Sequence, residues 1–222
     1  MMRMQPFEFP PPTPSDLADR EVPREGSRLD GVRIALMVTG GIAAFKAPLL
    51  ARALRRQGAC VTAFCSAEAL RYVTHDAMEW STTNPVVVQL SPNAEHLSDA
   101  APFDVYLVAP ATAATIARMA HGVAEGVVGA TLASAIGRME QGHARVLVAP
   151  TMHGSMHTSI LVENLEKLHR IGVRVIPPRD AYGKHNLPDE ATLVEEVCRA
   201  MVTQWKQTSQ HPTNQGSRSR VQ

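Results

Sequence analysis

An apolar run that stops at a proline and continues into small hydroxylated residues constrains the fold of this chain more than any other feature. Residues 105–109 read Val-Tyr-Leu-Val-Ala and lead through Pro110-Ala111-Thr112 into a helical pattern. Residues 145–150, Arg-Val-Leu-Val-Ala-Pro, show the same pattern of an apolar run that ends at a proline. Short β-forming runs with helices behind them are typical of buried parallel strands. Because open α/β sheets bind ligands at the carboxyl ends of their strands, these prolines and threonines indicate where a site lies.

Strands and helices alternate along most of the chain. The pattern predicts strands over residues 32–38, 60–65, 86–90, 105–109, 145–150 and 173–176. It predicts helices over residues 43–57, 66–72, 112–122, 125–136, 159–170 and 191–206. Apolar strands alternating with helices favour a parallel sheet covered on both faces. We therefore predict one doubly wound α/β domain, Rossmann-like in its flavodoxin-like form, with three α/β/α layers over residues 31–206.

The two ends of the chain and its composition restrict the protein further. Residues 1–30 are Pro-rich and residues 207–222 are polar, so we predict a flexible N-terminal extension and a disordered C-terminal tail. A net charge of +1 gives no reason to expect nucleic acid or an anionic membrane as a partner. No run reaches the roughly 18 apolar residues of a membrane span. Three cysteines without metal-type spacing favour a cytoplasmic protein.

Four strand-to-helix loops are expected at one edge of the sheet, because right-handed crossovers place them there. They read Thr39-Gly40-Gly41, Cys65-Ser66, Pro110-Ala111-Thr112 and Pro150-Thr151-Met152. Glycine, hydroxyl groups and helix N-termini can bind an anion without lysine. The first loop lacks the glycine pattern of a dinucleotide or Walker site, so a single phosphate, as in FMN, fits better. The alternative is that these are ordinary turn residues.

Histidines are the candidates for acid–base chemistry. His96 is expected to open a helix leading into the strand after Asp104, which would put it near the carboxyl edge of the sheet. The alternative for such a residue is an exposed loop histidine. His153 and His157 have the spacing of a helical metal pair, but Gly154 lies between them and no third ligand is evident. We predict no metal site.

Four motifs in this order resemble one known family. They are residues 39–46 (Thr-Gly-Gly-Ile-Ala-Ala-Phe-Lys), His96-Leu97 eight residues before Asp104, residues 110–115 (Pro-Ala-Thr-Ala-Ala-Thr) and residues 150–156 (Pro-Thr-Met-His-Gly-Ser-Met). Together they resemble the flavin-dependent cysteine decarboxylase family, and within it most nearly the phosphopantothenoylcysteine decarboxylases of coenzyme A biosynthesis. The resemblance covers about residues 31–190.

This resemblance implies FMN as cofactor, assembly as a homotrimer or a multiple of trimers, and oxidative decarboxylation of a small-molecule cysteinyl carboxylate. It implies catalytic roles for His96 and His153. It also implies cofactor-binding positions at Gly40, Gly41, Ile42, Ser66, Pro110, Thr112, Thr115 and Met152.

The chain departs from the family pattern at the substrate positions. Ala114 stands where the family has an asparagine that holds the substrate carboxylate, and His153 stands at another asparagine position. The late mobile loop, residues 177–188, lacks the family's cysteine but offers Arg179 and Lys184 to clamp an anionic substrate. Two alternatives stay open: a flavin prenyltransferase-like enzyme, and a flavin-binding accessory or regulatory subunit without catalysis.

Overall fold

A five-stranded parallel sheet forms the centre of the molecule. The computed structural model describes residues 9–97 and 101–202, so the predicted C-terminal tail lies outside the described residues. The strands lie in the order β2 (Cys60–Cys65), β1 (Arg33–Val38), β3 (Val105–Ala111), β4 (Arg145–Pro150) and β6 (Arg174–Val175). This is the flavodoxin-like order, in which the chain winds outward in both directions from β1. The predicted fold class is confirmed.

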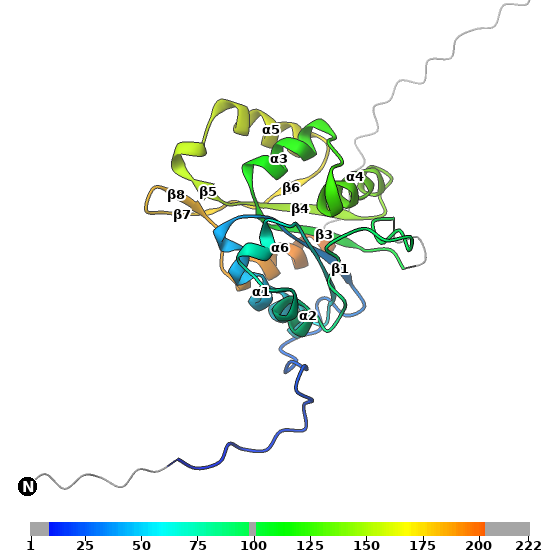
Figure 1. Cartoon of the computed structure of the whole chain (residues 1–222), viewed down its shortest axis with the longest axis vertical. Coiled ribbons are helices and arrows are strands. Elements are labelled where there is room, and N and C mark those ends of the chain that lie inside the picture. The colour runs from blue at the N-terminus through cyan, green and yellow to red at the C-terminus, as the bar shows by residue number, and fades with distance from the viewer. Residues whose placement is uncertain (1–8, 98–100, 203–222) are drawn as a thin grey trace, which may run out of the picture.

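Helices cover both faces of the sheet and make three layers (Figure 1). On one face lie α1 (Ala47–Arg56), α2 (His75–Thr82) and α6 (Glu190–Val202). On the other lie α3 (Ala113–His121), α4 (Gly126–Glu140) and α5 (Ser159–Arg170). Alternate residues of one strand therefore enter different cores: Leu36 packs in the first and Met37 in the second. Burial on both faces explains why the strands read as continuous apolar runs.

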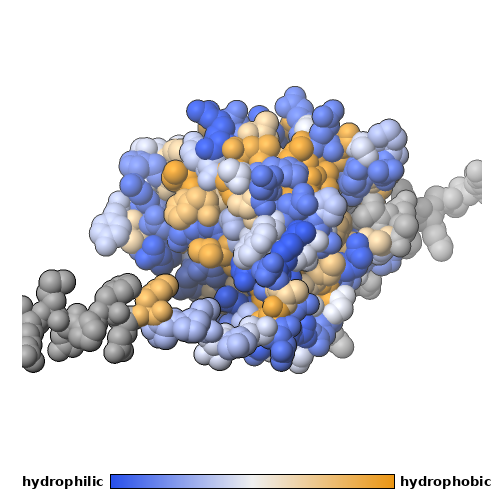
Figure 2. Space-filling view, turned by 60° about the horizontal axis from the view of Figure 1, so that its bottom comes forward, coloured by the Kyte–Doolittle hydropathy of each residue, from blue (hydrophilic) through white to orange (hydrophobic). Residues whose placement is uncertain are grey.

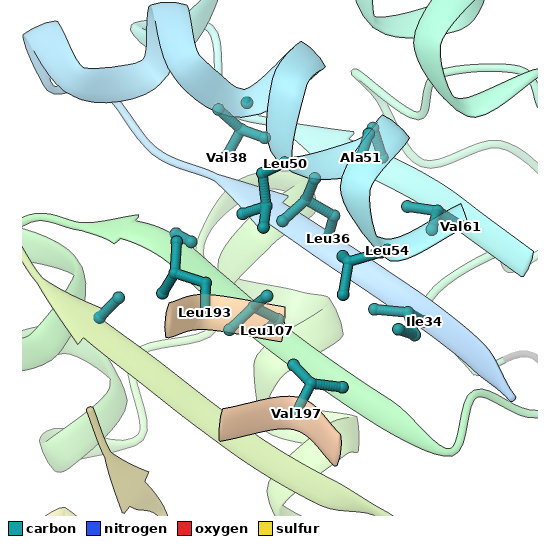
Figure 3. Close-up of a cluster of buried hydrophobic side chains, with 14 of the residues drawn as sticks. Ile34, Leu36, Val38, Leu50, Ala51, Leu54, Val61, Leu107, Leu193 and Val197 are labelled. Carbon is teal, nitrogen blue, oxygen red and sulfur yellow. The ribbon is translucent and has the colours of Figure 1, made fainter. Parts of the chain in front are cut away.

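The core beneath α1 and α6 fixes these helices to the sheet. Leu50 and Leu54 of α1 point toward Leu36 of β1, while Leu193 and Val197 of α6 approach β3 (Figure 3). Each of these side chains is at most 1% exposed. A fully buried leucine contributes about 1.5–3 kcal/mol to folding. This packing holds the strand ends that form the site.

Three local expectations differ from the structure. Helix α2 was not predicted, although Thr74 caps it by accepting a hydrogen bond from Ala77 N–H. Residues 86–90 form no strand: only Val87 bridges to Phe64, at the edge of the sheet. The helix predicted over residues 66–72 is one 3-10 turn, Ala69–Arg71. Short elements at a sheet edge are set by tertiary contacts more than by local pattern.

A small antiparallel sheet extends from the carboxyl end of β4 (Figure 1). It consists of β5 (Met152–His153), β8 (Lys184–Asn186) and β7 (Arg179–Ala181), in that order. Tyr182 and Gly183 connect β7 to β8 with positive φ angles of 55° and 67°. Two positive φ angles are the signature of a tight hairpin turn. The segment predicted as a mobile loop is therefore a paired hairpin.

The last residues of the predicted N-terminal extension contact the domain. Leu29 is fully buried, and its N–H donates to Gln57 O at 2.9 Å. Glu25 N–H donates to Arg56 O at 3.0 Å. The packed unit therefore reaches further toward the N-terminus than the predicted boundary at residue 31, because Leu29 supplies an apolar anchor.

Among the described helices, none by itself is long and apolar enough to cross a membrane. Only α3 and α4 counted together, with a 47° bend between them, pass that length and composition test.

Candidate functional site

The loops after β1 and β3 are joined by one buried hydroxyl. Thr39 is 2% exposed, and its hydroxyl donates to Pro110 O at 2.7 Å. Thr39 Oγ1 also accepts a hydrogen bond from Thr112 N–H at 3.2 Å. Thr39 thereby fixes the distance between the two strand ends at the point where the sheet order reverses, which is where ligands bind in such folds.

Gly40 allows the loop after β1 to lie against the loop after β2. A Cβ atom at Gly40 would come within 2.3 Å of Glu68 Cβ, closer than two carbon atoms can approach. The turn is tightened further by Gly41 N–H, which donates to Thr39 O at 2.8 Å. Glycine is thus required at position 40 by a close approach, as the predicted cofactor-binding role would need.

Hydroxyl groups cap the helical turns that start at this edge. Thr112 is the N-cap of α3: its Oγ1 accepts from Thr115 N–H at 3.3 Å and lies 3.0 Å from Thr115 Oγ1. Ser66 Oγ accepts from Ala69 N–H at 3.2 Å. The N-terminus of α3 therefore presents its partial positive charge at the same edge.

A cavity of about 420 Å³ lies at this edge of the sheet. Its polar end is formed by the loops after β1 and β2 and by the first turn of α3. Its other end is formed by α4 and the α3–α4 connection. Of the predicted site residues, the structure brings together at this cavity Gly40, Ser66, Thr112, Ala114 and Thr115.

Sequence reasoning missed the other walls of the cavity. The apolar wall comes from Met119, Val123, Val127, Val128, Leu132 and Ile136. Three charged residues, Glu68, Arg118 and Glu125, also line it. Helical spacing offered a signal for Arg118, which follows Ala114 by four residues and so shares its face of α3. The α4 wall carries no such motif, and only the fold reveals it.

Three predicted cofactor positions, Gly41, Ile42 and Pro110, lie beside the cavity rather than in its wall. A Cβ at Gly41 would be 3.5 Å from Thr112 Cγ2 and 3.9 Å from Pro110 Cγ, so these residues are neighbours. Ile42 begins a 3-10 helix, Ile42–Lys46, and its side chain is 69% exposed. None of the three is among the residues that line the cavity.

The remaining predicted substrate and cofactor residues gather in the antiparallel sheet instead. Met152 and His153 form β5, His153 pairs with Lys184 of β8, and Arg179 begins β7. His153 Nδ1 accepts a hydrogen bond from Ser155 N–H at 3.1 Å and thereby caps the turn Gly154–Met156. This group does not line the cavity in a single chain.

His96 lies in a turn, where a helix was expected to begin. Residues 93–97 are turn or coil, and residues 98–100 lie outside the described part of the chain. The imidazole Nδ1 is shielded from solvent and has no hydrogen-bond partner among the described residues. His96 is not part of the cavity wall, so its catalytic position stays a prediction.

A second titratable cluster spans the antiparallel sheet. Asp180 Oδ1 lies 2.6 Å from His185 Nδ1, and His185 Nε2 lies 2.9 Å from His157 Nδ1. These form a chain of hydrogen bonds from β7 through β8 to the residue after the 3-10 turn. Within residues 9–97 and 101–202, no group of three or more His, Cys, Asp or Glu side chains could hold a metal ion.

Cys65 ends β2 next to Ser66 and is fully buried. Burial raises the pKa of its thiol to about 12, because the thiolate would lose its hydration. Cys65 therefore stays a neutral, unreactive thiol at physiological pH.

Comparison with known proteins identifies the family of this chain. The Flavoprotein family matches residues 23–211. The coenzyme A biosynthesis bifunctional protein CoaBC of Thermococcus kodakarensis is 36% identical over 179 residues, which are 78% of this chain and 43% of that protein. The chain thus spans less than half the length of this relative.

Two solved structures share the fold. The FMN-dependent cysteine decarboxylase SpaF aligns with a TM-score of 0.68 at 24% identity, covering 78% of this chain and 97% of SpaF. A dodecameric FMN-dependent Ubix-like decarboxylase from Escherichia coli O157:H7 aligns with a TM-score of 0.60 at 21% identity, covering 77% and 92%. The resemblance that the four motifs predicted is confirmed. Because the family match takes in most of its residues, the chain belongs to the Flavoprotein family.

Proposed function

We propose that this chain binds FMN in the cavity at the β1–β3 edge and performs oxidative decarboxylation of a cysteinyl carboxylate, in coenzyme A biosynthesis or a related pathway. One observation carries the proposal: the cavity has a polar end of glycine and hydroxyl groups and an apolar end from α4. FMN has the same two-ended character, with a phosphate and a flat apolar ring. The names of CoaBC and SpaF point to the same cofactor and reaction class.

The polar end fits a phosphate. Gly40 lets the loop after β1 pack against Glu68 in the loop after β2, and Gly40 and Ser66 both line the cavity. Ser66 and Thr112 add hydroxyl groups, and the α3 N-terminus adds partial positive charge. In this proposal the phosphate lies at Gly40 and Ser66, and Thr112 and Thr115 contact the flavin.

The apolar end fits a ring system. Val127, Leu132 and Ile136 of α4 face the cavity together with Met119 of α3. A cavity of about 420 Å³ falls within the roughly 300–1,000 Å³ of small-molecule sites. Bound FMN would supply the oxidant for the thiol-bearing carbon, and the adjacent carboxylate could then leave as carbon dioxide, with its bonding electron pair taken up by the thiocarbonyl group.

The chain's own residues then have to position the substrate and move one proton. His96 is the proposed acid or base, because its Nδ1 is unpartnered within the described residues. His153 accepts a backbone N–H at Nδ1, so its neutral ring carries the proton on Nε2 and can donate a hydrogen bond. Arg179 and Lys184, with Met152 beside them, are proposed to approach the substrate from the antiparallel sheet.

We also propose a homotrimer, or a multiple of trimers, in the cytoplasm. Several large apolar side chains are exposed, among them Ile42 at 69%, Phe45 at 55% and Ile160 at 68%. Apolar surface gathers in patches on the face shown in Figure 2. Patches of this kind mark interaction surfaces on proteins. In a single chain the antiparallel sheet does not line the cavity. In the proposed trimer, the antiparallel sheet of a neighbouring copy lies near it instead.

Flavin titration and carbon dioxide release test the function. The purified chain is expected to bind FMN with a shift of the flavin absorbance bands, and to release carbon dioxide from phosphopantothenoylcysteine. The His96→Asn variant is expected to keep FMN and to lose about 10²–10⁴-fold in turnover. A chain that takes up no FMN would contradict the whole proposal. FMN binding without carbon dioxide release would leave the accessory-subunit alternative, which the alanine at position 114 favours.

A further inference from the structure

Arg118 is the single basic side chain among the residues that line the cavity. It lies one helical turn beyond Ala114 on α3, and both residues belong to the exposed face of that helix. The opposite face, with Ile116 and Ala120, is buried. The cavity also contains two acidic residues, Glu68 and Glu125. An anionic ligand that enters past the α3–α4 connection therefore meets one cation.

The partner that Arg118 has in this structure holds it weakly. Arg118 Nε lies 3.9 Å from Glu125 Oε2, and the two side chains are 53% and 76% exposed. Ion pairs this exposed contribute about 0–1 kcal/mol. A ligand carboxylate can instead accept two parallel N–H bonds from the guanidinium, a stronger arrangement. Glu125 is thus a counter-ion that a ligand carboxylate can displace.

We propose that Arg118 binds the carboxylate of the substrate at the mouth of the cavity and that Glu125 competes for the same guanidinium. The site would then select cysteine derivatives whose α-carboxylate is free over those in which it is amidated. This inference rests on the proposed function, because it takes the substrate to be a cysteinyl carboxylate.

Arg118 lies apart from Gly40 and Ser66, the residues proposed to bind the phosphate. Arg118 follows Thr112, the N-cap of α3, by six residues, so its Cα lies about 9 Å further along the helix at 1.5 Å per residue. Its ion-pair partner, Glu125, belongs to the α3–α4 connection, whereas Gly40 and Ser66 belong to the loops after β1 and β2. In this proposal Arg118 binds the substrate carboxylate, and Gly40 and Ser66 bind the phosphate of FMN.

The chemistry of decarboxylation dictates which kinetic constant Arg118 affects. The carboxylate loses its negative charge as the bond to carbon dioxide breaks, so a cation stabilises the bound substrate at least as much as the transition state. Such an interaction lowers KM without raising kcat. The competition from Glu125 keeps the pairing weak enough that it does not hold back the loss of carbon dioxide.

Binding of an unreactive ligand tests the proposal without turnover. The ligands are the S-methyl thioether of phosphopantothenoylcysteine, whose sulfur carries no proton to lose, and its α-carboxamide. Both are titrated calorimetrically into the FMN-loaded wild type and into Arg118→Met, Arg118→Lys and Glu125→Gln. A hydrogen bond to a charged group contributes about 1.5–3 kcal/mol, so we expect the wild type to prefer the acid by about 10- to 100-fold.

Arg118→Met is expected to abolish that preference, Arg118→Lys to keep part of it, and Glu125→Gln to tighten binding of the acid but not of the amide. In turnover, Arg118→Met is expected to raise KM at unchanged or slightly higher kcat. Equal binding of acid and amide by the wild type, or binding of neither, overturns the proposal. So does a fall in kcat at unchanged KM.

Titration of FMN and riboflavin into the same variants separates this inference from the proposed function. We expect both flavins to bind Arg118→Met as they bind the wild type. A loss of FMN affinity with riboflavin unaffected would assign Arg118 to the cofactor phosphate and overturn the inference. Failure of the wild type to bind FMN would instead contradict the proposed function.

Discussion

The carboxyl edge of the sheet carries two regions built in opposite ways. The polar end of the cavity beside β1 and β3 is made of glycine and hydroxyl groups that are fixed by backbone contacts, such as the bond from Thr39 to Pro110 O. The antiparallel sheet beyond β4 carries titratable side chains that contact one another, such as the exposed His157 and the half-buried His185. At the polar end of the cavity a ligand meets backbone and hydroxyl groups, and at the antiparallel sheet it meets titratable groups.

This difference teaches how the two tasks of the proposed reaction are divided. Holding a phosphate and a flat ring requires a rigid shape, which close backbone packing provides. Moving a proton requires titratable groups, which the antiparallel sheet carries. Of the departures from the family pattern, His153 lies in the second region, whereas Ala114 lines the cavity of the first region together with Gly40, Ser66 and Thr112.

The largest effect is expected from a methyl group at the cavity. Gly40→Ala places a Cβ 2.3 Å from Glu68 Cβ, so one loop must shift. Overpacking of this kind costs about 1–3 kcal/mol, which corresponds to about a 5- to 150-fold loss of FMN affinity if the loop after β1 moves. Fluorescence titration of FMN measures it. Gly137→Ala is the matched control, because nothing lies within 4 Å of its new Cβ and the variant should bind normally. Wild-type affinity in Gly40→Ala would show that this loop does not touch the cofactor.

A smaller effect, confined to alkaline pH, is expected at Cys65. Burial raises its thiol pKa from 9.0 to about 12 in the folded chain, so between these values the unfolded chain ionises and the folded chain does not. The free energy of unfolding therefore falls as pH rises from 9 toward 12, by about 1 kcal/mol at pH 10 from this thiol. Cys65→Ala should remove that part of the slope in urea unfolding at pH 8 and pH 10. Cys60→Ala, at an exposed position, should leave the slope unchanged. Equal slopes in wild type and Cys65→Ala would contradict the expectation.

The smallest effect is expected in the antiparallel sheet. His185→Ala removes both the contact with Asp180 and the contact with His157. Because Asp180 is 69% exposed, the loss should be below about 1 kcal/mol and local to the hairpin. Hydrogen exchange should accelerate in β7 and β8 by a few fold, with no change in the melting temperature of the sheet. Asp180→Asn keeps an acceptor oxygen and should show less acceleration. Faster exchange throughout β1 and β3 would mean that the two regions are not independent.

Sequence reasoning reached the parallel sheet and its polar edge because both follow from local pattern. The pattern of residues 105–112 predicts a buried strand that ends at a proline and a helix that begins after Thr112. The structure has β3 at this place and Thr112 as the N-cap of α3. The β7–β8 hairpin was not predicted because its turn is Tyr182-Gly183, and tyrosine rarely adopts a positive φ angle. The pairing of β5 with β8 joins segments some thirty residues apart, which no local pattern encodes.

The site was predictable on one side only. Gly40, Ser66 and Thr112 lie in loops whose motifs are contiguous in the sequence. The wall from Val127 to Ile136 has only the pattern of a buried helix, because its role depends on how α4 lies against α3. His96 was expected to open a helix and lies in a turn, where the hydrogen bonds are local: Ser91 N–H donates to Glu95 Oε2 and Asn93 N–H donates to Ser91 Oγ.

The polar end of the cavity comes from the strand-to-helix loops and its apolar wall comes mainly from α4, so the two can be altered separately. Three residues of the wall, Gly126, Gly129 and Ala133, carry at most a methyl group and contribute nothing to the central sheet. Ala133 can therefore be enlarged or exchanged to reshape the chamber while the anchoring edge keeps its geometry. The size of the cavity can therefore be changed at Ala133 without changing its polar end, and variants at this position should fold with altered ligand preferences.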